Sequence, residues 1–158
     1  MSCENFESGE SVRAVVVSFL VVAFLSPLSF AEDRSQGSPV LLGAGLDGRW
    51  AIDCNGPASA ANIVLSYVTP DKGPPTERFS EDPVDVRTTE LLDVKQLKNG
   101  DLEWVVAEGE VMITIQTQLK DNRLRTWSSV SSDGHQYITK AKTGDGKPVP
   151  WFNKCETN

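Results

Sequence analysis

The stretch Gly48-Arg49-Trp50-Ala51-Ile52-Asp53-Cys54 decides the fold predicted for this chain. Within it Trp50, Ile52 and Cys54 occupy every second position, which is the period of a β-strand that buries one face. Trp50 is therefore expected in the core. The stretch ends in a cysteine whose one plausible partner is Cys155, near the C-terminus. A first strand tied to the last segment predicts a closed or nearly closed β-domain.

The first 31 residues are predicted to be a cleaved signal peptide. Residues 14–30 form an apolar run after Arg13, and Ser29-Phe30-Ala31 places small residues where signal peptidase cuts. We expect cleavage after Ala31 and a periplasmic or secreted protein. An uncleaved N-terminal anchor is the alternative, because the run is near the lower length limit for crossing a bilayer.

Charge and length restrict the classes of function. The chain has 158 residues, of which 15 are basic and 22 acidic, for a net charge of −7. The predicted mature chain keeps a net charge of about −5, and it has no basic patch with interleaved aromatic residues, which argues against nucleic acid as a partner. One domain is expected at residues 47–158, after a flexible tether at 32–46 whose stretch 41–46 could pack across a barrel mouth.

Two cysteines remain once the leader and its Cys3 are removed. In an exported chain Cys54 and Cys155 most simply form a disulfide. The closed loop has about 100 residues, and the loop-entropy model gives it roughly 4–5 kcal/mol of stabilisation, an upper figure because native strain subtracts from it. Two buried free thiols are the alternative.

Short β-strand patterns separated by turn residues follow along the rest of the chain. Residues 76–80 are expected to form a short edge strand, and Asn99-Gly100 to form a type I′ hairpin turn. No segment has the helical period. The pattern predicts an all-β fold, an antiparallel up-and-down meander of seven or eight strands, closed or nearly closed into a barrel. A two-sheet β-sandwich is the alternative.

Two faces of the meander compete for the interior. The face with Val111, Ile113 and Ile115 is the more apolar and is favoured as the buried one, which leaves Arg125 and Trp127 outside. In the opposite arrangement Arg125 and Trp127 line a polar, aromatic cavity suited to a small anionic ligand. In the strand expected after residue 122, strict alternation puts four residues on a common face: Leu124, Thr126, Ser128 and Val130.

The opening Gly48-Arg49-Trp50 resembles the first strand of the calycin barrels, the lipocalin and avidin-like families. In those families the tryptophan plugs one end of the barrel, and a basic side chain of a late strand often packs against it. The candidates for that basic side chain are Arg123, Arg125 and Lys140. The W-x-x-D-C start and the C-terminal cysteine are also similar to a group of uncharacterised secreted proteobacterial proteins. An ordinary core tryptophan is the alternative interpretation of Trp50.

Residues with catalytic chemistry are sparse. His135 is the single histidine and lies beside a turn glycine, so a zinc site would need carboxylates for nearly all its ligands. The pairs Glu81-Asp82 and Glu108 with Glu110 are what strand geometry produces by itself. We therefore expect no enzyme, and neither a cofactor nor a metal.

The predicted function is non-enzymatic binding of a small hydrophobic or amphipathic ligand by a monomeric exported protein with no membrane span after cleavage. The alternative is an envelope protein-interaction module or a protease inhibitor that acts through surface loops. A co-purifying ligand would favour the first, and an exposed stripe of Arg125 and Trp127 the second. The candidate ligand-binding residues are Trp50, Tyr67, Trp104, Arg125 and Trp127.

Overall fold

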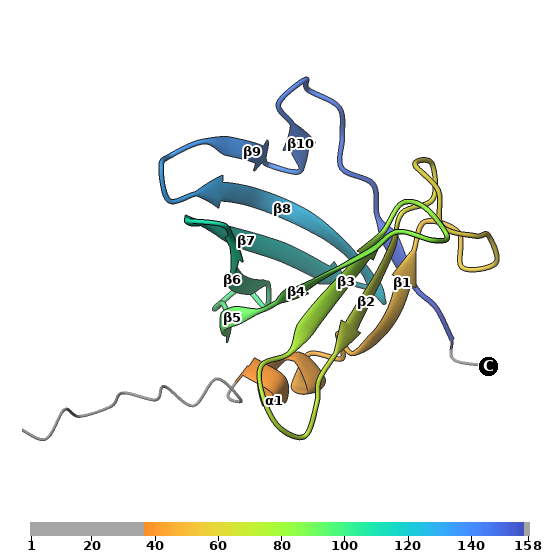
Figure 1. Cartoon of the computed structure of the whole chain (residues 1–158), viewed down its shortest axis with the longest axis horizontal. Helices are drawn as coiled ribbons and strands as arrows, with labels where there is room; N and C mark the ends of the chain where they lie inside the picture. The colour runs from red at the N-terminus through yellow and green to blue at the C-terminus, as the bar shows by residue number, and fades with distance from the viewer. Residues whose placement is uncertain (1–36, 157–158) are drawn as a thin grey trace, which may run out of the picture. The chain divides into compact units, whose positions relative to one another are not determined.

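The computed structural model of the chain describes residues 37–156, which form eleven β-strands and one short helix (Figure 1). The predicted all-β fold class is confirmed. The predicted signal peptide, residues 1–31, and residues 32–36 of the predicted tether lie outside the described part. The elements are α1 (Gly37–Gly43), β1 (Gly48–Ala51), β2 (Val64–Val68), β3 (Thr76–Ser80), β4 (Val86–Glu90), β5 (Leu92–Gln96), β6 (Leu102–Glu108), β7 (Val111–Lys120), β8 (Arg123–Ser131), β9 (Gln136–Thr139), β10 (Lys142–Thr143) and β11 (Phe152–Lys154).

The strands form one antiparallel sheet that combines two meanders. Strands β1 to β4 pair in sequence order, and so do β5 to β8, with β9 and β10 continuing from β8. The C-terminal β11 lies between β1 and β8 and joins the two meanders. The predicted up-and-down order therefore holds inside each meander and is wrong where the tail enters the sheet. The eleven strands of the described part exceed the seven or eight predicted, and the tail strand β11 and the two-residue β10 are among those not predicted.

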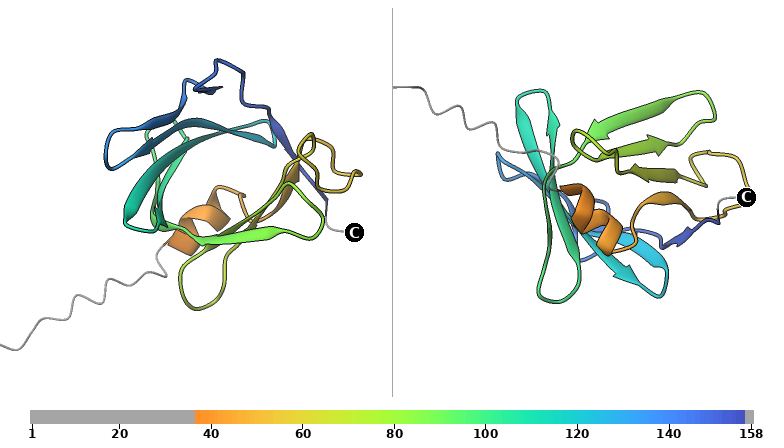
Figure 2. Two further views of the ribbon diagram at one scale, coloured as in Figure 1. Left: turned by 45° about the horizontal axis from the view of Figure 1, so that its top comes forward. Right: turned by 90° about the horizontal axis from the view of Figure 1, so that it is seen from below.

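The two ends of the sheet, β4 and β5, follow one another in sequence with Leu91 alone between them. Leu91 is buried, and its N–H donates to the carbonyl of Pro75 at 2.8 Å. The sheet curls so that β2–β4 face β6–β8 across an interior (Figure 2). Within residues 37–156 no ladder joins β4 to β5, so the sheet is not closed. A single sheet also contradicts the two-sheet sandwich.

The predicted disulfide between Cys54 and Cys155 is confirmed, with Cα atoms 5.3 Å apart. It lies beside the pairing of β1 with β11, in which Trp50 is opposite Lys154. The N–H of Cys155 also donates to the carbonyl of Arg49 at 2.8 Å. The covalent link and the ladder therefore fix the same two segments.

The helix α1 packs at one end of the curled sheet (Figure 2). Leu41 and Leu46 have no exposed surface. The contact with β5 is so close that a Cβ atom added to Gly37 would lie 2.8 Å from Cγ2 of Val94. Residues 37–46 are thus part of the packed domain, and the predicted flexible tether is wrong for them because the two leucines bury apolar surface there.

The favoured face of β7 points inward. Ile113 is buried, whereas its neighbour Met112 is 39% exposed. The ladder partners of Ile113, Val106 on β6 and Ser131 on β8, are buried as well. The core cluster consists of Leu41, Leu46, Trp50, Leu65, Tyr67, Leu91, Leu102, Trp104, Val106, Ile113, Leu124 and Phe152.

A β-bulge in β8 changes which side chains enter the interior. Thr126 pairs with Thr117, but the next pair is Ser128 with Gln116, so Trp127 is an extra residue in the strand. The alternation shifts by one residue beyond it. Ser129 is consequently buried, and the predicted common face for Ser128 and Val130 with Leu124 is wrong beyond the bulge.

The type I′ turn predicted at Asn99-Gly100 is found in a different hairpin, at Asp121-Asn122. In the loop between β5 and β6, the carbonyl of Leu97 accepts from the N–H of Gly100 at 2.9 Å, and Gly100 has φ 88° while Asn99 is not at positive φ. The predicted type I′ turn is therefore wrong there. Asp121 and Asn122, between β7 and β8, have φ angles of 52° and 55° and make the two-residue turn of type I′.

Candidate ligand site on the inner face of the sheet

Tyr67 of β2 and Trp104 of β6 meet across the interior. Their ring centroids are 5.7 Å apart, and the ring planes form an angle of 67°. The two strands are not neighbours in the sheet, since β1, β11, β8 and β7 separate them. The edge-to-face contact is therefore made through the interior of the curl, and both rings are buried. Of the candidate ligand-binding residues, these two are the pair that the fold brings together on the inner face.

The indole N–H of Trp104 has no hydrogen-bond partner although the side chain is only 1% exposed. In the described part, one other buried side-chain polar atom has no hydrogen-bond partner, the hydroxyl oxygen of Ser38. An unsatisfied buried donor costs about 1–3 kcal/mol. An acceptor that reached Trp104 Nε1 would therefore recover a large part of that free energy.

Glu77 of β3 is directly opposite Tyr67 in the ladder between β2 and β3. Opposed residues of an antiparallel ladder share a face, so the carboxyl group points into the curl with the tyrosine. Burial raises the pKa of Glu77, and a hydrogen bond with Tyr67 opposes that rise. Burial and the nearby carboxyl group both raise the pKa of Tyr67 well above its usual value. The inner face thus holds a carboxyl group whose pKa is raised by burial.

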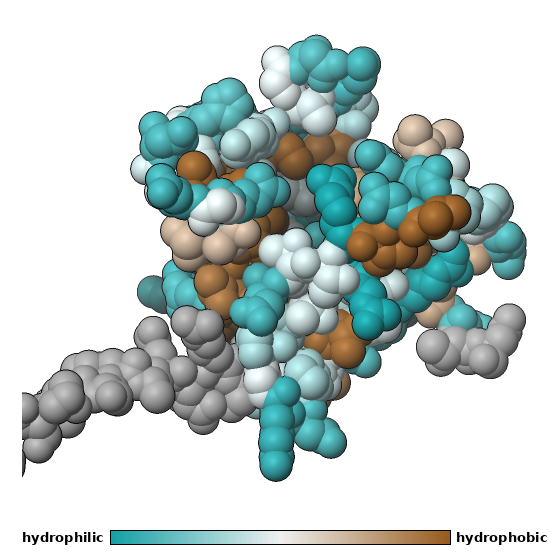
Figure 3. Space-filling view, viewed as in Figure 1, coloured by the Kyte–Doolittle hydropathy of each residue, from teal (hydrophilic) through white to brown (hydrophobic). Residues whose placement is uncertain are grey.

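Phe79 and Arg87 lie where the inner face of the sheet becomes accessible to solvent. Phe79 is opposite Leu65 on one side and Arg87 on the other. The guanidinium of Arg87 lies 4.5 Å from the centroid of the Phe79 ring, and Arg87 is exposed while Phe79 is half-buried. Hydrophobic residues show between the hydrophilic residues of β9–β10 and those of β3–β4 (Figure 3). The inner face is therefore apolar at Phe79 and charged at its solvent-exposed border, where Arg87 lies.

Sequence reasoning missed the three residues Glu77, Phe79 and Arg87. Residues 76–80 were expected to form an edge strand, but β3 lies between β2 and β4. An internal strand presents a full inner face, and the alternation of Glu77 and Phe79 with the exposed Arg78 was the available signal.

Trp50, another candidate ligand-binding residue, already has partners within the chain for its indole N–H and for its ring. Its indole N–H donates to the carbonyl of Leu46 at 2.7 Å, and Nζ of Lys154 lies 5.5 Å from its ring centroid. Lys154 also donates to the carbonyl of Gly45 at 2.6 Å. The basic side chain over Trp50 therefore comes from β11, and none of the three candidates from sequence takes that position.

Arg125 and Trp127 are on the outer face, away from Tyr67 and Trp104. Arg125 is opposite Gln118, and its Nε donates to Oε1 of that glutamine at 3.0 Å. The guanidinium of Arg125 is 5.7 Å from the centroid of Trp127. The five candidate ligand-binding residues are thus divided between Trp50 beside Lys154, an inner pair and an outer pair.

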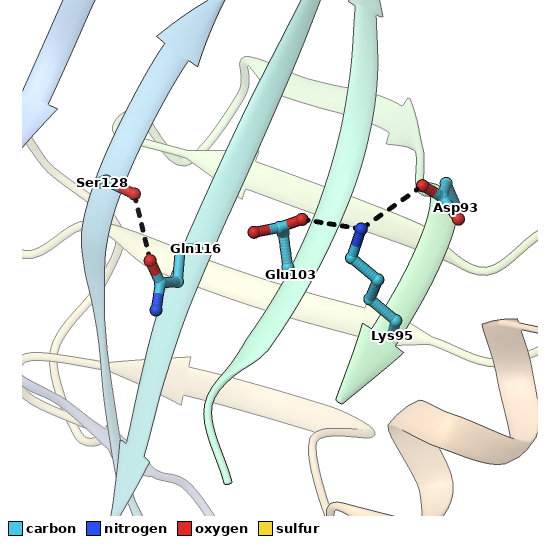
Figure 4. A network of polar contacts seen from close by, with 5 residues as sticks. All are labelled: Asp93, Lys95, Glu103, Gln116 and Ser128. Carbon is cyan, nitrogen blue, oxygen red and sulfur yellow. Dashed lines mark hydrogen bonds and ion pairs between the residues drawn. The ribbon is translucent and has the colours of Figure 1, made fainter. Parts of the chain in front are cut away.

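A row of polar contacts crosses the outer face of β5 to β8 (Figure 4). Nζ of Lys95 lies 2.9 Å from the carboxylate of Glu103 and 3.8 Å from that of Asp93. Further along the row, the hydroxyl of Ser128 donates to Oε1 of Gln116 at 3.5 Å. Glu103, as the larger influence, raises the pKa of Lys95. Exposed pairs of this kind stabilise little and offer no catalytic geometry, so we assign the row to the surface of the sheet.

Within residues 37–156 no group of three or more histidine, cysteine, aspartate or glutamate side chains is arranged to hold a metal ion. His135 stacks edge-on against Tyr137, with ring centroids 4.5 Å apart, in the turn before β9. The described part also contains no helix with the length and apolar character needed to cross a bilayer.

No protein-family model, no curated protein and no solved structure matches this chain.

Proposed function

We propose that the chain is an exported, non-enzymatic binding protein that holds a small hydrophobic or amphipathic ligand inside a calycin-like barrel. The observation that carries the proposal is the unpartnered indole N–H of Trp104, buried against Tyr67 on the inner face. Native proteins pair more than nine in ten of their buried polar groups, so a donor left free inside an apolar wall is a place for an acceptor from outside.

The surroundings of Trp104 define the chemistry of the ligand. The neighbouring side chains are mostly apolar, which suits a hydrocarbon or aromatic body. A hydrogen-bond acceptor on that body, such as a carbonyl or ether oxygen, would accept from Trp104 Nε1. The burial that raises the pKa of the Glu77 carboxyl group also disfavours a charged ligand in the same space, so an uncharged ligand is favoured over an anion.

The calycin-like barrel is supported by contacts at one end of the sheet. Trp50 lies near α1 with Lys154 over its ring, so a tryptophan of the first strand and a basic side chain of the last strand meet there. The single residue between β4 and β5 brings the two ends of the sheet together at Leu91. Both features are consistent with a barrel that encloses a ligand.

Export is supported by the disulfide, because such bonds persist in oxidising compartments. Intact mass spectrometry of the protein purified from its native host is the corresponding measurement. We expect a monomer whose mass lacks residues 1–31 and two hydrogens. A retained leader or two free thiols would contradict the proposed periplasmic or secreted location.

The ligand proposal is tested with the probe N-phenyl-1-naphthylamine, whose fluorescence rises in apolar sites, and with two competitors of similar length, 2-undecanone and undecane. The ketone should displace the probe at a concentration about 3–10 times lower than the alkane, since one hydrogen bond contributes about 0.5–1.5 kcal/mol. Trp104→Phe should abolish that difference. Trp127→Phe, the same replacement on the outer face, should preserve it.

Absence of probe binding to the disulfide-bonded protein would reject an interior ligand site. Equal displacement by ketone and alkane with the unaltered protein would reject the role of Trp104 Nε1.

The alternative function, a protein-interaction module or protease inhibitor acting through surface loops, is favoured by one observation, the outer position of Arg125 and Trp127.

A further inference from the structure

Two arginines and two tryptophans alternate on the outer face beside β8 and β11. The guanidinium of Arg125 lies 4.3 Å from the ring centroid of Trp151 and 5.7 Å from that of Trp127. The guanidinium of Arg123 lies 5.3 Å from the Trp151 ring. We call Arg123, Arg125, Trp127 and Trp151 the arginine–tryptophan stack. Arg123 is exposed and the other three are half-buried, so the stack forms part of the accessible surface.

Arg125 is held in place by two kinds of contact. Its planar group lies over indole rings, and its Nε donates to Oε1 of Gln118 at 3.0 Å. Among residues 37–156 no hydrogen bond or ion pair uses the two Nη atoms of Arg125. A guanidinium fixed through its plane and its Nε keeps its remaining N–H groups available for a bidentate contact with a carboxylate.

The stack is a cationic area on an acidic protein. Lys120 is opposite Arg123 in the ladder between β7 and β8 and adds a third positive charge on that face. The ion pairs of the described part join Lys95 to Asp93 and Glu103, and Lys147 to Asp145, so none neutralises the stack. With a net charge of −7 for the chain, this local surplus of positive charge is complementary to an anionic partner.

We infer that the arginine–tryptophan stack is a docking surface for an acidic segment of a partner protein, whose carboxylates bind Arg125 and Arg123. Tryptophan and arginine are the residue types that contribute most at protein interfaces. The Trp151 ring is in contact with two guanidinium groups, which leaves less of its face for stacking on a sugar ring and favours a protein over a polysaccharide. The inference does not depend on a ligand in the interior.

The test uses the full disulfide-bonded chain and, as a probe, a poly-L-glutamate peptide of about 20 residues, with binding measured by calorimetry at low salt. We expect binding that weakens as salt is added, because the contact is electrostatic. Arg125→Ala should weaken it about tenfold. Arg78→Ala, which removes the same charge from an exposed position on β3, should leave it unchanged.

A second pair of variants keeps all arginines and guards against a folding defect in Arg125→Ala. Gln118→Glu places a carboxylate against Arg125 and should block the peptide, whereas Thr114→Glu, on the same face of β7 but four residues away, should bind it normally. Equal losses in the two members of either pair would overturn the inference. Binding to heparin with none to poly-L-glutamate would also overturn it, in favour of a polysaccharide.

Discussion

Two buried tryptophans with similar sequence patterns have different roles. Each is 1% exposed, although Trp104 lies between two less buried residues of β6 and Trp50 is followed by the fully buried Ala51. The N–H of Trp50 is satisfied by Leu46, whereas that of Trp104 is free. The alternation that predicts burial carries no information on a partner contributed by a distant segment. Sequence therefore predicted Trp104 as a candidate ligand-binding residue, but not the unpaired donor that makes it the centre of the candidate site.

Glu77 makes the stability of the fold dependent on pH. Burial places the pKa of its carboxyl group in the folded protein above the unfolded value of about 4.3. The stabilising contribution is thus complete below the unfolded pKa and is lost as the pH rises through the folded pKa. We expect the wild-type protein to lose stability relative to Glu77→Gln between pH 4 and the folded pKa. Urea unfolding of both proteins across that range measures the difference.

Tyr67→Phe provides the control for this pH dependence. The hydrogen bond of Tyr67 lowers the pKa of Glu77, so its removal should raise that pKa and extend the loss of stability to higher pH. Parallel unfolding curves for the wild type and Glu77→Gln at every pH would show that the carboxyl group is solvated, and the inner face would then have to be assigned differently.

At the scale of single elements, hairpins and alternation were predictable, and their exceptions were not. Asn99-Gly100 indicated a hairpin correctly, but the loop uses positive φ at Gly100 alone. The bulge at Trp127 leaves no mark in the alternation of β8, because it arises from the register with Gln116 and Thr117 on the neighbouring strand. The inward turn of Ser129 follows from that pairing and could not be inferred from the strand by itself.

The turn between β7 and β8 gives a prediction at this scale. Asn122 has φ 55°, a conformation that costs most L-residues about 1 kcal/mol and that asparagine and glycine tolerate. Asn122→Ala should lower the free energy of unfolding by about 1 kcal/mol, and Asn122→Gly should keep or slightly raise it. Denaturant unfolding measures both. Lys98→Ala, in a hairpin loop without positive φ at that residue, should change little, and an equal loss there would argue against backbone strain.

For the whole molecule, sequence predicted that the ends of the domain are tied, but not how the tail takes part. The tail was expected to return to the first strand, and Cys155 does so. Its strand β11 is only three residues long and follows an irregular segment rich in glycine and proline, so no periodicity marked it. Nor could local patterns show that β11 separates β1 from β8, because that position is decided by pairing between distant segments.

This position makes β11 the seam between the two meanders. In the described part, the ladders of β11 with β1 and with β8 are the ones that connect β1–β4 to β5–β8. The other connection is the chain itself at Leu91. Each seam ladder has two registered residue pairs, far fewer than the eight between β7 and β8. The disulfide lies next to this short seam, where each ladder has only two registered pairs.

Replacing Cys54 and Cys155 by serine should therefore affect the seam before the rest of the sheet. We expect the free energy of unfolding to fall by about 2–4 kcal/mol, the usual loss for a disulfide that closes a long loop. Amide hydrogen exchange followed by mass spectrometry should rise first in β1, β11 and the start of β8, while β6 and β7 stay protected, because local opening follows the weakest pairing. Uniform acceleration across all strands would instead mean that the disulfide stabilises only by restricting the unfolded chain, with no local role at the seam.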